Sequence, residues 1–148
     1  MPTLFLLCGL PGSGKTTLAK QLEREQPALR LTPDEWMGPL FGTSHDEPKR
    51  AIVEALQWEV AEKALALGIS VVLDWGFWSR TERDDFRSRA AALGADAGVR
   101  FLDVPRNELS RRLEVRNAAL LPGTFRVTDA EIDLYITTFE PPTSDELE

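Results

Sequence analysis

Cysteine and long apolar runs are nearly absent from this sequence of 148 residues. Cys8 is its only cysteine, so neither an intrachain disulfide nor a cysteine zinc cluster can form. No apolar run reaches the roughly 20 residues that cross a bilayer, so we expect no membrane segment. The apolar run from Leu4 to Cys8 lacks a basic leader and a cleavage site, so it indicates a buried strand rather than a signal peptide. We therefore expect a cytoplasmic protein.

Repeats, low-complexity segments and Gly/Ser linkers are also missing, which predicts one domain over residues 1–148. A chain of this length hides roughly two-thirds of its unfolded surface, enough for its own core. Positive charge is scarce, because 17 Lys and Arg stand against 24 Asp and Glu, a net charge of −7. Binding to long nucleic acids depends on Lys and Arg against phosphates, so such a partner is disfavoured, although a local basic patch is compatible with this charge.

Apolar runs alternate with helix signals four times along the chain. The runs predict buried strands at residues 3–8, 29–31, 69–73 and 99–104. Apolar spacing, prolines and glycines predict helices at residues 15–25, from 33 onward, 48–67, 80–93, 105–117, and from 129 to the prolines at 141 and 142. This alternation predicts an α/β fold with a parallel sheet and helices on both faces. Ligands of such sheets bind beyond the carboxyl ends of the strands, so we expect the chemistry in the segments after residues 8, 31, 73 and 104.

Three helix starts carry the pattern of a capping box, in which a Ser or Thr and a Glu three residues later satisfy each other's backbone N–H groups. These pairs are Thr32 with Glu35, Ser79 with Glu82, and Thr128 with Glu131. The helix over 48–67 is predicted from apolar residues at helical spacing, namely Ile52, Leu56, Val60, Ala64 and Leu67. Trp58 is expected in the core.

The segment after the first predicted strand matches the phosphate-loop (Walker A) pattern of a glycine, four residues and Gly-Lys-Ser/Thr. Its residues are Gly9, Leu10, Pro11, Gly12, Ser13, Gly14, Lys15 and Thr16, and we count the next residue, Thr17, with the nucleotide-binding set. The glycines let backbone N–H groups turn toward phosphates, Lys15 faces the β and γ phosphates, and Thr16 is placed to ligate Mg²⁺. ATP is favoured over GTP, because no Asn-Lys-x-Asp guanine signature occurs.

Two aspartates follow predicted strands and are candidates for the chemistry. Asp74 ends the run Val71 to Leu73, where a carboxylate reaches the Mg²⁺ shell or the substrate. The next residue is Trp75 rather than the water-activating glutamate of hydrolytic motors, which disfavours a motor ATPase. Asp34 is the best candidate for the base that accepts the proton of an acceptor hydroxyl. The alternative is that Asp34 only favours a helix N-terminus, the structural role that we assign to Glu35.

Arg112 and Arg116 lie four residues apart on one face of a predicted helix. With Arg126 across the following loop, they indicate a lid over about residues 106–127 that neutralises phosphate charge. Surface pairing with Glu108, Glu114 or Asp129 is the alternative.

The sequence resembles P-loop kinases of the chloramphenicol phosphotransferase, zeta-toxin and polynucleotide 5'-hydroxyl kinase type, which are akin to nucleoside monophosphate kinases. The resemblance covers most of the chain through the segments 9–16, 31–36, 71–75 and 111–117. It implies a three-layer P-loop fold with strand order 2-3-1-4, ATP and Mg²⁺ as cofactors, Asp34 as general base and arginines on a mobile lid. Polynucleotide kinases carry an arginine three residues after the base, whereas this chain has Met37. Whether a fifth strand follows the proline pair is open.

Aromatic residues should converge on the mouth of the cleft, where they stack on an acceptor or belong to the core: Trp36, Trp75, Phe77 and Trp78. Arg80 and Arg83 hold an anionic acceptor or pair on their own helix, and His45 is expected to be a solvated loop residue. We assign Asp34, Trp36, Trp75 and Arg80 to the acceptor site.

The leading hypothesis is an ATP-dependent kinase that phosphorylates a hydroxyl group of a small molecule. The alternatives are phosphorylation of the 5'-hydroxyl end of a short nucleic acid and a regulatory module that binds ATP without transferring phosphate. The sequence names neither the acceptor nor the oligomeric state.

Overall fold

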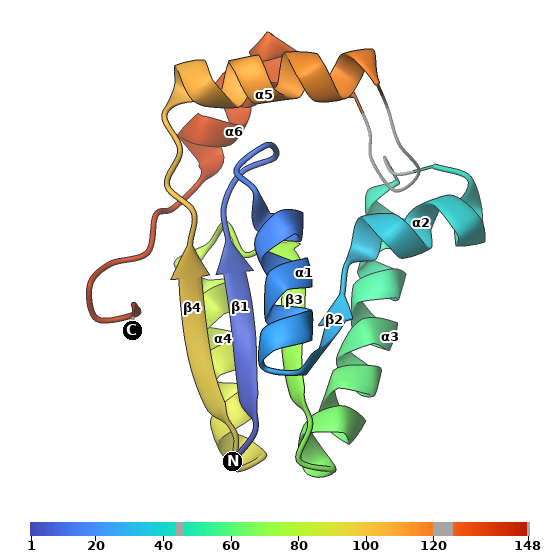
Figure 1. Ribbon diagram of the computed structural model, residues 1–148, viewed down its shortest axis with the longest axis vertical. Helices are drawn as coiled ribbons and strands as arrows, with labels where there is room; N and C mark the ends of the chain where they lie inside the picture. The colour runs from blue at the N-terminus through green and yellow to red at the C-terminus, as the bar shows by residue number, and fades with distance from the viewer. Residues whose placement is uncertain (44–45, 120–125, 148) are drawn as a thin grey trace.

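The computed structural model describes residues 1–43, 46–119 and 126–147. Four strands form one sheet: β1 (Thr3–Cys8), β2 (Ala28–Leu31), β3 (Ser70–Gly76) and β4 (Asp96–Phe101). They are all parallel and lie in the order β2-β3-β1-β4 (Figure 1). The predicted α/β class and the strand order implied by the resemblance are therefore confirmed.

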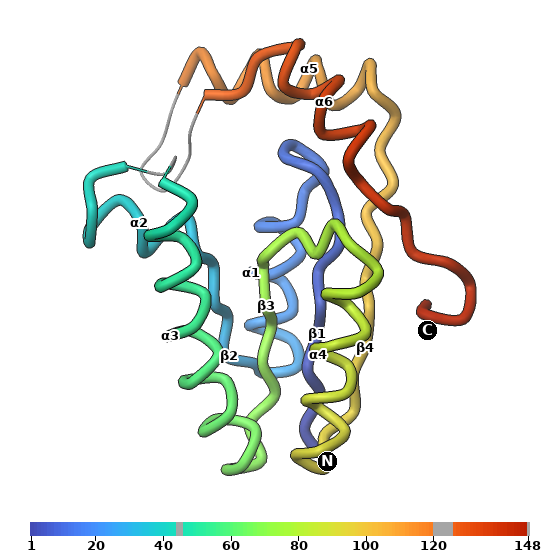
Figure 2. Tube along the Cα trace, turned by 180° about the vertical axis from the view of Figure 1, so that it is seen from behind, coloured from blue at the N-terminus to red at the C-terminus, as the bar shows by residue number. Residues whose placement is uncertain are grey.

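Six helices surround this sheet within the described residues: α1 (Lys15–Glu25), α2 (Pro33–Phe41), α3 (Glu47–Ala66), α4 (Arg80–Ala92), α5 (Arg106–Ala118) and α6 (Asp129–Thr138). Helix α1 covers one face, while α3 and α4 cover the other (Figures 1 and 2). Helices α5 and α6 lie across the carboxyl ends of the strands (Figure 1). No helix in the described ranges is both long and apolar enough to cross a membrane.

The burial of strand β1 on both faces explains why its sequence is continuously apolar. Leu4, Leu6 and Cys8 belong to the core cluster under α3 and α4, whereas Phe5 and Leu7 belong to the cluster under α1. Side chains of a strand alternate between its two faces, so a strand covered on both sides is apolar at every position. This burial fixes the end of β1, and with it the loop that follows.

Most of the apolar residues that predicted α3 lie off its buried face, with Ala64 as the exception. Ile52 is 53% exposed, Leu56 44% and Val60 39%. The sheet instead contacts the neighbouring face, whose buried residues are Val53, Gln57, Trp58, Ala61, Ala64 and Leu65. Small residues such as Ala61 let the helix approach the strands closely. Trp58 lies in the core as expected and meets the Phe86 ring edge-on, with centroids 5.1 Å apart.

The capping predictions have three different outcomes. Thr128 and Glu131 form the complete box at α6. Ser79 accepts a hydrogen bond from the Glu82 N–H, which is half of the predicted box. The box at α2 is wrong, because Thr32 makes no cap hydrogen bond and Glu35 pairs with Arg30 at 2.7 Å.

Strand β4 begins and ends three residues earlier than predicted. Its pairing with β1 runs from Thr3 opposite Asp96 to Cys8 opposite Phe101. It is an edge strand, so the exposed polar residues Asp96 and Arg100 are tolerated within it. An apolar pattern alone does not show such a polar beginning.

The carboxyl-terminal segment returns to the edge of β4 after the proline pair. In the described range it makes a single parallel bridge, Val99 with Leu147, in place of a full fifth strand. Glu146 is buried there and forms an ion pair with Arg83 at 2.7 Å, with both side chains 0% exposed. Arg83 also donates to the Phe77 carbonyl at 2.8 Å, so the segment is tied to the loop after β3.

Candidate active site

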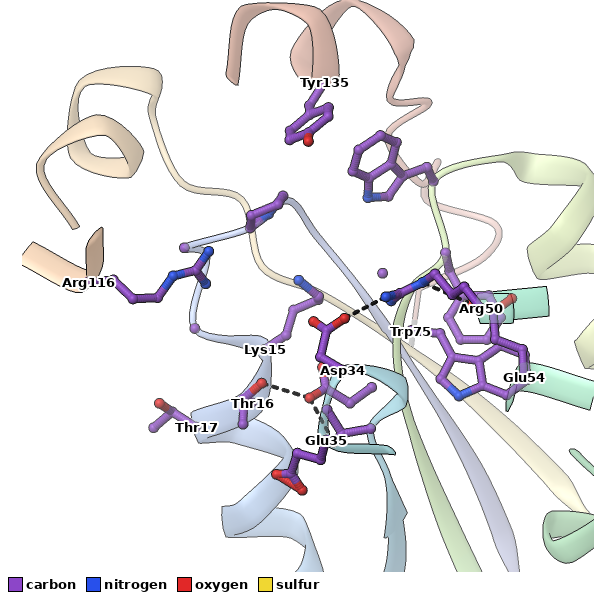
Figure 3. Close-up of a pocket in the computed structure, with 18 of the residues that line it drawn as sticks. Lys15, Thr16, Thr17, Asp34, Glu35, Arg50, Glu54, Trp75, Arg116 and Tyr135 are labelled. Atoms are coloured by element: carbon purple, nitrogen blue, oxygen red, sulfur yellow. Dashed lines mark hydrogen bonds and ion pairs between the residues drawn. The ribbon is translucent and has the colours of Figure 1, made fainter. Parts of the chain in front are cut away.

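A cavity of about 920 Å³ opens at the carboxyl ends of the strands (Figure 3). It is lined by eleven of the predicted site residues: Pro11, Gly12, Gly14, Lys15, Thr16, Thr17, Asp34, Asp74, Trp75, Arg112 and Arg116. These residues come from the β1–α1 loop, α2, the end of β3 and α5. The fold thus brings most of the predicted site together. Gly9, Leu10 and Ser13 belong to the phosphate loop but are not among the described residues that line the cavity.

The phosphate loop has a backbone that depends on glycine at two positions. Gly12 and Gly14 have φ angles of +84° and +96°, a region that other residues rarely adopt. A Cβ atom on Gly12 would also come within 2.9 Å of Leu113 Cγ in α5. Gly14 is the N-cap of α1, so the helix begins with backbone N–H groups beside the cavity. Such a helix start is an anion-binding site.

Lys15 reaches from the first residue of α1 into the cavity (Figure 3). Its Nζ donates to the Leu10 carbonyl at 3.2 Å, so the amine folds back over the loop. Burial lowers the pKa of Lys15, while the carboxylates of Asp74 and Asp34 oppose this shift. The residue is therefore a desolvated amine that lines the cavity close to two carboxylates.

Thr16 and Asp74 meet next to the loop. Thr16 Oγ1 donates to Asp74 Oδ2 at 2.7 Å, and Thr32 Oγ1 donates to the same oxygen at 3.0 Å. Thr32 is thus drawn to the neighbouring strand rather than to its own helix. No cluster of three His, Cys, Asp or Glu that could hold a metal occurs in the described ranges. Mg²⁺ binds through one or two protein oxygens, water and phosphates, so the Thr16–Asp74 pair suits it.

Asp34 lies in the first turn of α2 and lines the cavity. Its Oδ1 accepts a hydrogen bond from Arg50 Nη1 at 2.5 Å, which forms an ion pair (Figure 3). Arg50 belongs to α3 and also approaches Glu54 at 3.5 Å. Sequence reasoning missed Arg50. Its only signal was its place in the first turn of a helix that follows a loop, which is too common to single it out.

Helix α5 lies over the phosphate loop, with Leu113 packed against Gly12. Arg112 Nη1 lies 3.3 Å from the Ser13 carbonyl and 3.4 Å from that of Gly12. Its Nε donates to Glu108, one of the surface partners weighed above. Burial lowers the pKa of Arg116, and Asp34 opposes this shift. Of the expected lid, residues 120–125 lie outside the described residues.

Three further aromatic contacts involve side chains that line the cavity, those of Trp75, Trp78 and Tyr135. Trp75 Nε1 donates to Gln57 Oε1 at 3.0 Å, which fixes the indole ring. Trp78 Nε1 donates to the Gly9 carbonyl at 3.3 Å and therefore contacts the phosphate loop directly. Tyr135 of α6 meets the Trp78 ring with centroids 5.0 Å apart. Sequence reasoning missed Tyr135, because α6 gave no sign that it reaches the cleft.

Three glutamates near one another, at the end of the cavity formed by α3 and α4, were also missed: Glu47, Glu54 and Glu82. Burial raises the pKa of Glu54 to about 7; Arg50 opposes this shift, while Glu82 and Glu47 add to it. Burial also raises the pKa of Glu82. This end of the cavity is therefore acidic and partly desolvated.

Two residues assigned to the acceptor site lie elsewhere in the described structure. Trp36 packs against the core cluster instead of lining the cavity. Arg80 forms ion pairs with Asp84 at 3.1 Å and Asp145 at 2.7 Å, also outside the cavity lining. Both belong to helix turns near the strand ends, and packing against neighbouring segments turns their side chains away. His45 lies outside the described residues.

Comparison with known proteins gives one family match and several similar structures. A family model described as an AAA domain matches residues 4–142. A candidate kinase from Chloroflexus aurantiacus has a TM-score of 0.76 at 19% identity, over 96% of this chain and 82% of that chain. A gluconokinase from Sinorhizobium meliloti 1021 has a TM-score of 0.66 at 19% identity, over 97% of this chain and 78% of that chain.

A chain of the Pnkp1/Rnl/Hen1 RNA repair complex has a TM-score of 0.78 at 25% identity. The match covers 93% of this chain but 43% of that one, so this chain spans less than half of the length of the RNA repair protein.

Proposed function

Because this chain belongs to the AAA domain family and has the fold of P-loop kinases, we propose that it transfers the γ-phosphoryl group of ATP to a hydroxyl group of a small molecule. The observation that carries this proposal is that the phosphate loop and the carboxylate of Asp34 line one cavity. A transferase needs an acceptor-side base within reach of the donor phosphate, whereas simple nucleotide binding does not.

In this proposal the phosphates of ATP bind to the backbone of Gly9–Thr16 and to the start of α1. Lys15 neutralises the terminal phosphates, and Thr17 continues the binding surface. Thr16 and Asp74 are the residues that would hold Mg²⁺, and the ion would offset the negative charge of the phosphates.

Asp34 accepts the proton of the acceptor hydroxyl as the hydroxyl oxygen bonds to the γ-phosphorus, while the bond from that phosphorus to the β–γ bridging oxygen breaks and ADP leaves. The ion pair with Arg50 holds the carboxylate at the cavity wall, so its orientation is set before an acceptor arrives. Arg112 and Arg116 approach from α5, where they stabilise the negative charge on the transferred group.

Phosphorylation of a nucleic acid end is the second candidate, since one similar structure is a chain of an RNA repair complex. Met37, at the place of the phosphate-holding arginine, is 0% exposed and offers no cation to a substrate phosphate. This observation favours the small-molecule acceptor.

The test is transfer of label from γ-labelled ATP to a library of hydroxyl compounds and to 5'-hydroxyl oligonucleotides. We expect labelled small molecules with the natural chain and none with Lys15→Ala or Asp34→Ala. If ATP binds but no compound is labelled, and Asp34→Ala changes no measurable activity, the chain is a regulatory module and the proposal fails.

A further inference from the structure

We propose that the acceptor carries a positive charge near its hydroxyl group, as an amino sugar or another amino alcohol does. This inference rests on the proposed function and narrows it to one class of substrate. It follows from the uneven distribution of charge along the cavity.

The two ends of the cavity differ in sign. Lys15, Arg112 and Arg116 stand around the phosphate loop, where the anionic donor belongs. At the other end, α3 and α4 contribute Glu47, Glu54 and Glu82. Figure 3 shows Arg116 on one side of Lys15 and Glu54 on the other.

Arg50 is the cation that lines the acidic end in the described residues, and it is already engaged. It pairs with Asp34 at 2.5 Å and with Glu54 at 3.5 Å. Glu47 acts on the same guanidinium, which therefore faces three carboxylates.

The cation that acts on Glu82 is Arg83, which is already paired with Glu146. The carboxylates of this end therefore outnumber the cations that face them. A fourth lining glutamate, Glu35, is matched by Arg30 at 2.7 Å and adds nothing to this excess.

An aromatic residue at this end offers a further attraction for a cation. Trp75 lies beside Glu54 (Figure 3) and lines the cavity, and an aromatic ring attracts an ammonium group through its quadrupole. Its indole N–H donates to Gln57 and its ring stacks on Phe77, so the ring is in place before binding. An ammonium ion between carboxylates and a fixed ring is well matched, whereas a carboxylate or phosphate would be repelled.

The cost of burying carboxylates supports the same conclusion. Glu54 has a side chain 29% exposed, and burial raises its pKa to about 7. Partly desolvated ionised carboxylates are energetically unfavourable unless a cation pairs with them. A bound ammonium group would stabilise the ionised form of Glu54 and would itself gain from the low solvent access.

The experiment uses the full chain, γ-labelled ATP and a broad library of hydroxyl compounds sorted into charge-matched sets. Examples are glucosamine, N-acetylglucosamine and glucuronic acid, or serinol, glycerol and glycerate. We expect label on cationic members. In the best set, Glu54→Gln with Glu82→Gln should raise KM for the cationic member by about tenfold or more, with a smaller change in kcat.

The control is Glu62→Gln, which removes the same charge from the exposed side of α3 outside the cavity lining and should leave KM unchanged. If the best acceptor is neutral or anionic, or if the double variant leaves KM unchanged, the charge inference is wrong while the kinase function stands. If no compound of any charge is labelled, the proposed function fails and the inference fails with it.

Discussion

The two ends of the cavity are built in different ways. The phosphate end is formed mainly by one uninterrupted segment, Gly9–Thr16, which presents backbone groups whose geometry is set by glycines and by the start of α1, and α5 adds Arg112 and Arg116. The acidic end is assembled from single side chains of α3, α4 and the end of β3. The first arrangement suits any nucleoside triphosphate, whereas the second suits one kind of acceptor. Changes at the first end should therefore reduce every reaction, and changes at the second should alter which acceptor is used.

The largest effect is expected at the phosphate end, from Lys15→Met. Loss of the cation should lower the rate of label transfer by on the order of 10³-fold or more, equally for all acceptors, because the charge of the transferred group is common to them. Initial rates with two unrelated acceptors measure this. Lys20→Met should lower the transfer rate less, because Lys20 lies five residues further along α1, away from the phosphate loop. Unequal losses for the two acceptors would contradict the division between the ends.

Asp34→Asn comes next, because it removes the base and keeps the shape. We expect kcat to fall about 10²- to 10³-fold with little change in ATP affinity. ATP affinity is measured by protection against thermal unfolding in the presence of Mg²⁺. If ATP affinity falls as much as kcat, Asp34 contributes to ATP binding, and the proposed division of roles between the two ends of the cavity is wrong.

Arg50→Met tests whether the ion pair positions Asp34. With the guanidinium gone, the carboxylate loses its 2.5 Å partner, and kcat should fall about tenfold. Its neighbour Lys49→Met, a surface cation outside the cavity lining, is the matched control. The pH profile of kcat should also change for Arg50→Met only, because the charge beside Asp34 has changed; equal profiles would mean that Arg50 has a structural role alone.

The smallest effect concerns pH. Burial raises the pKa of Glu54 to about 7; Glu82 and Glu47 also raise this pKa, and Arg50 lowers it. The Glu54 carboxyl group therefore becomes negatively charged as the pH rises through about 7. KM for a cationic acceptor should therefore fall about three- to tenfold between about pH 6 and pH 8. For the neutral member of the same set it should stay constant. Glu54→Gln should make KM for the cationic acceptor independent of pH over this range. If KM still depends on pH in this variant, another group is responsible for the titration.

Much of the phosphate end could be predicted because a contiguous motif carries its own geometry. The acidic end could not, since it depends on which face of α3 meets the sheet. The apolar residues Ile52, Leu56 and Val60 indicate the helix but lie on its exposed side, so they do not reveal where Arg50 and Glu54 point. Thr32 failed as a cap for a related reason: the sequence shows a hydroxyl before a helix, but not the carboxylate of Asp74 on the next strand.

The buried pair of Arg83 and Glu146 links the last turn of the chain to its first loop. Arg83 holds the Phe77 carbonyl, Phe77 adopts a φ of +45°, and the neighbouring Gly76 carbonyl accepts the Gly9 N–H at 3.0 Å. Any free energy that nucleotide binding adds to this loop is shared with the distant turn through thermodynamic linkage. Amide hydrogen exchange over residues 143–147 should consequently slow when ATP is present, so that protection of this segment reports ligand occupancy at the phosphate loop.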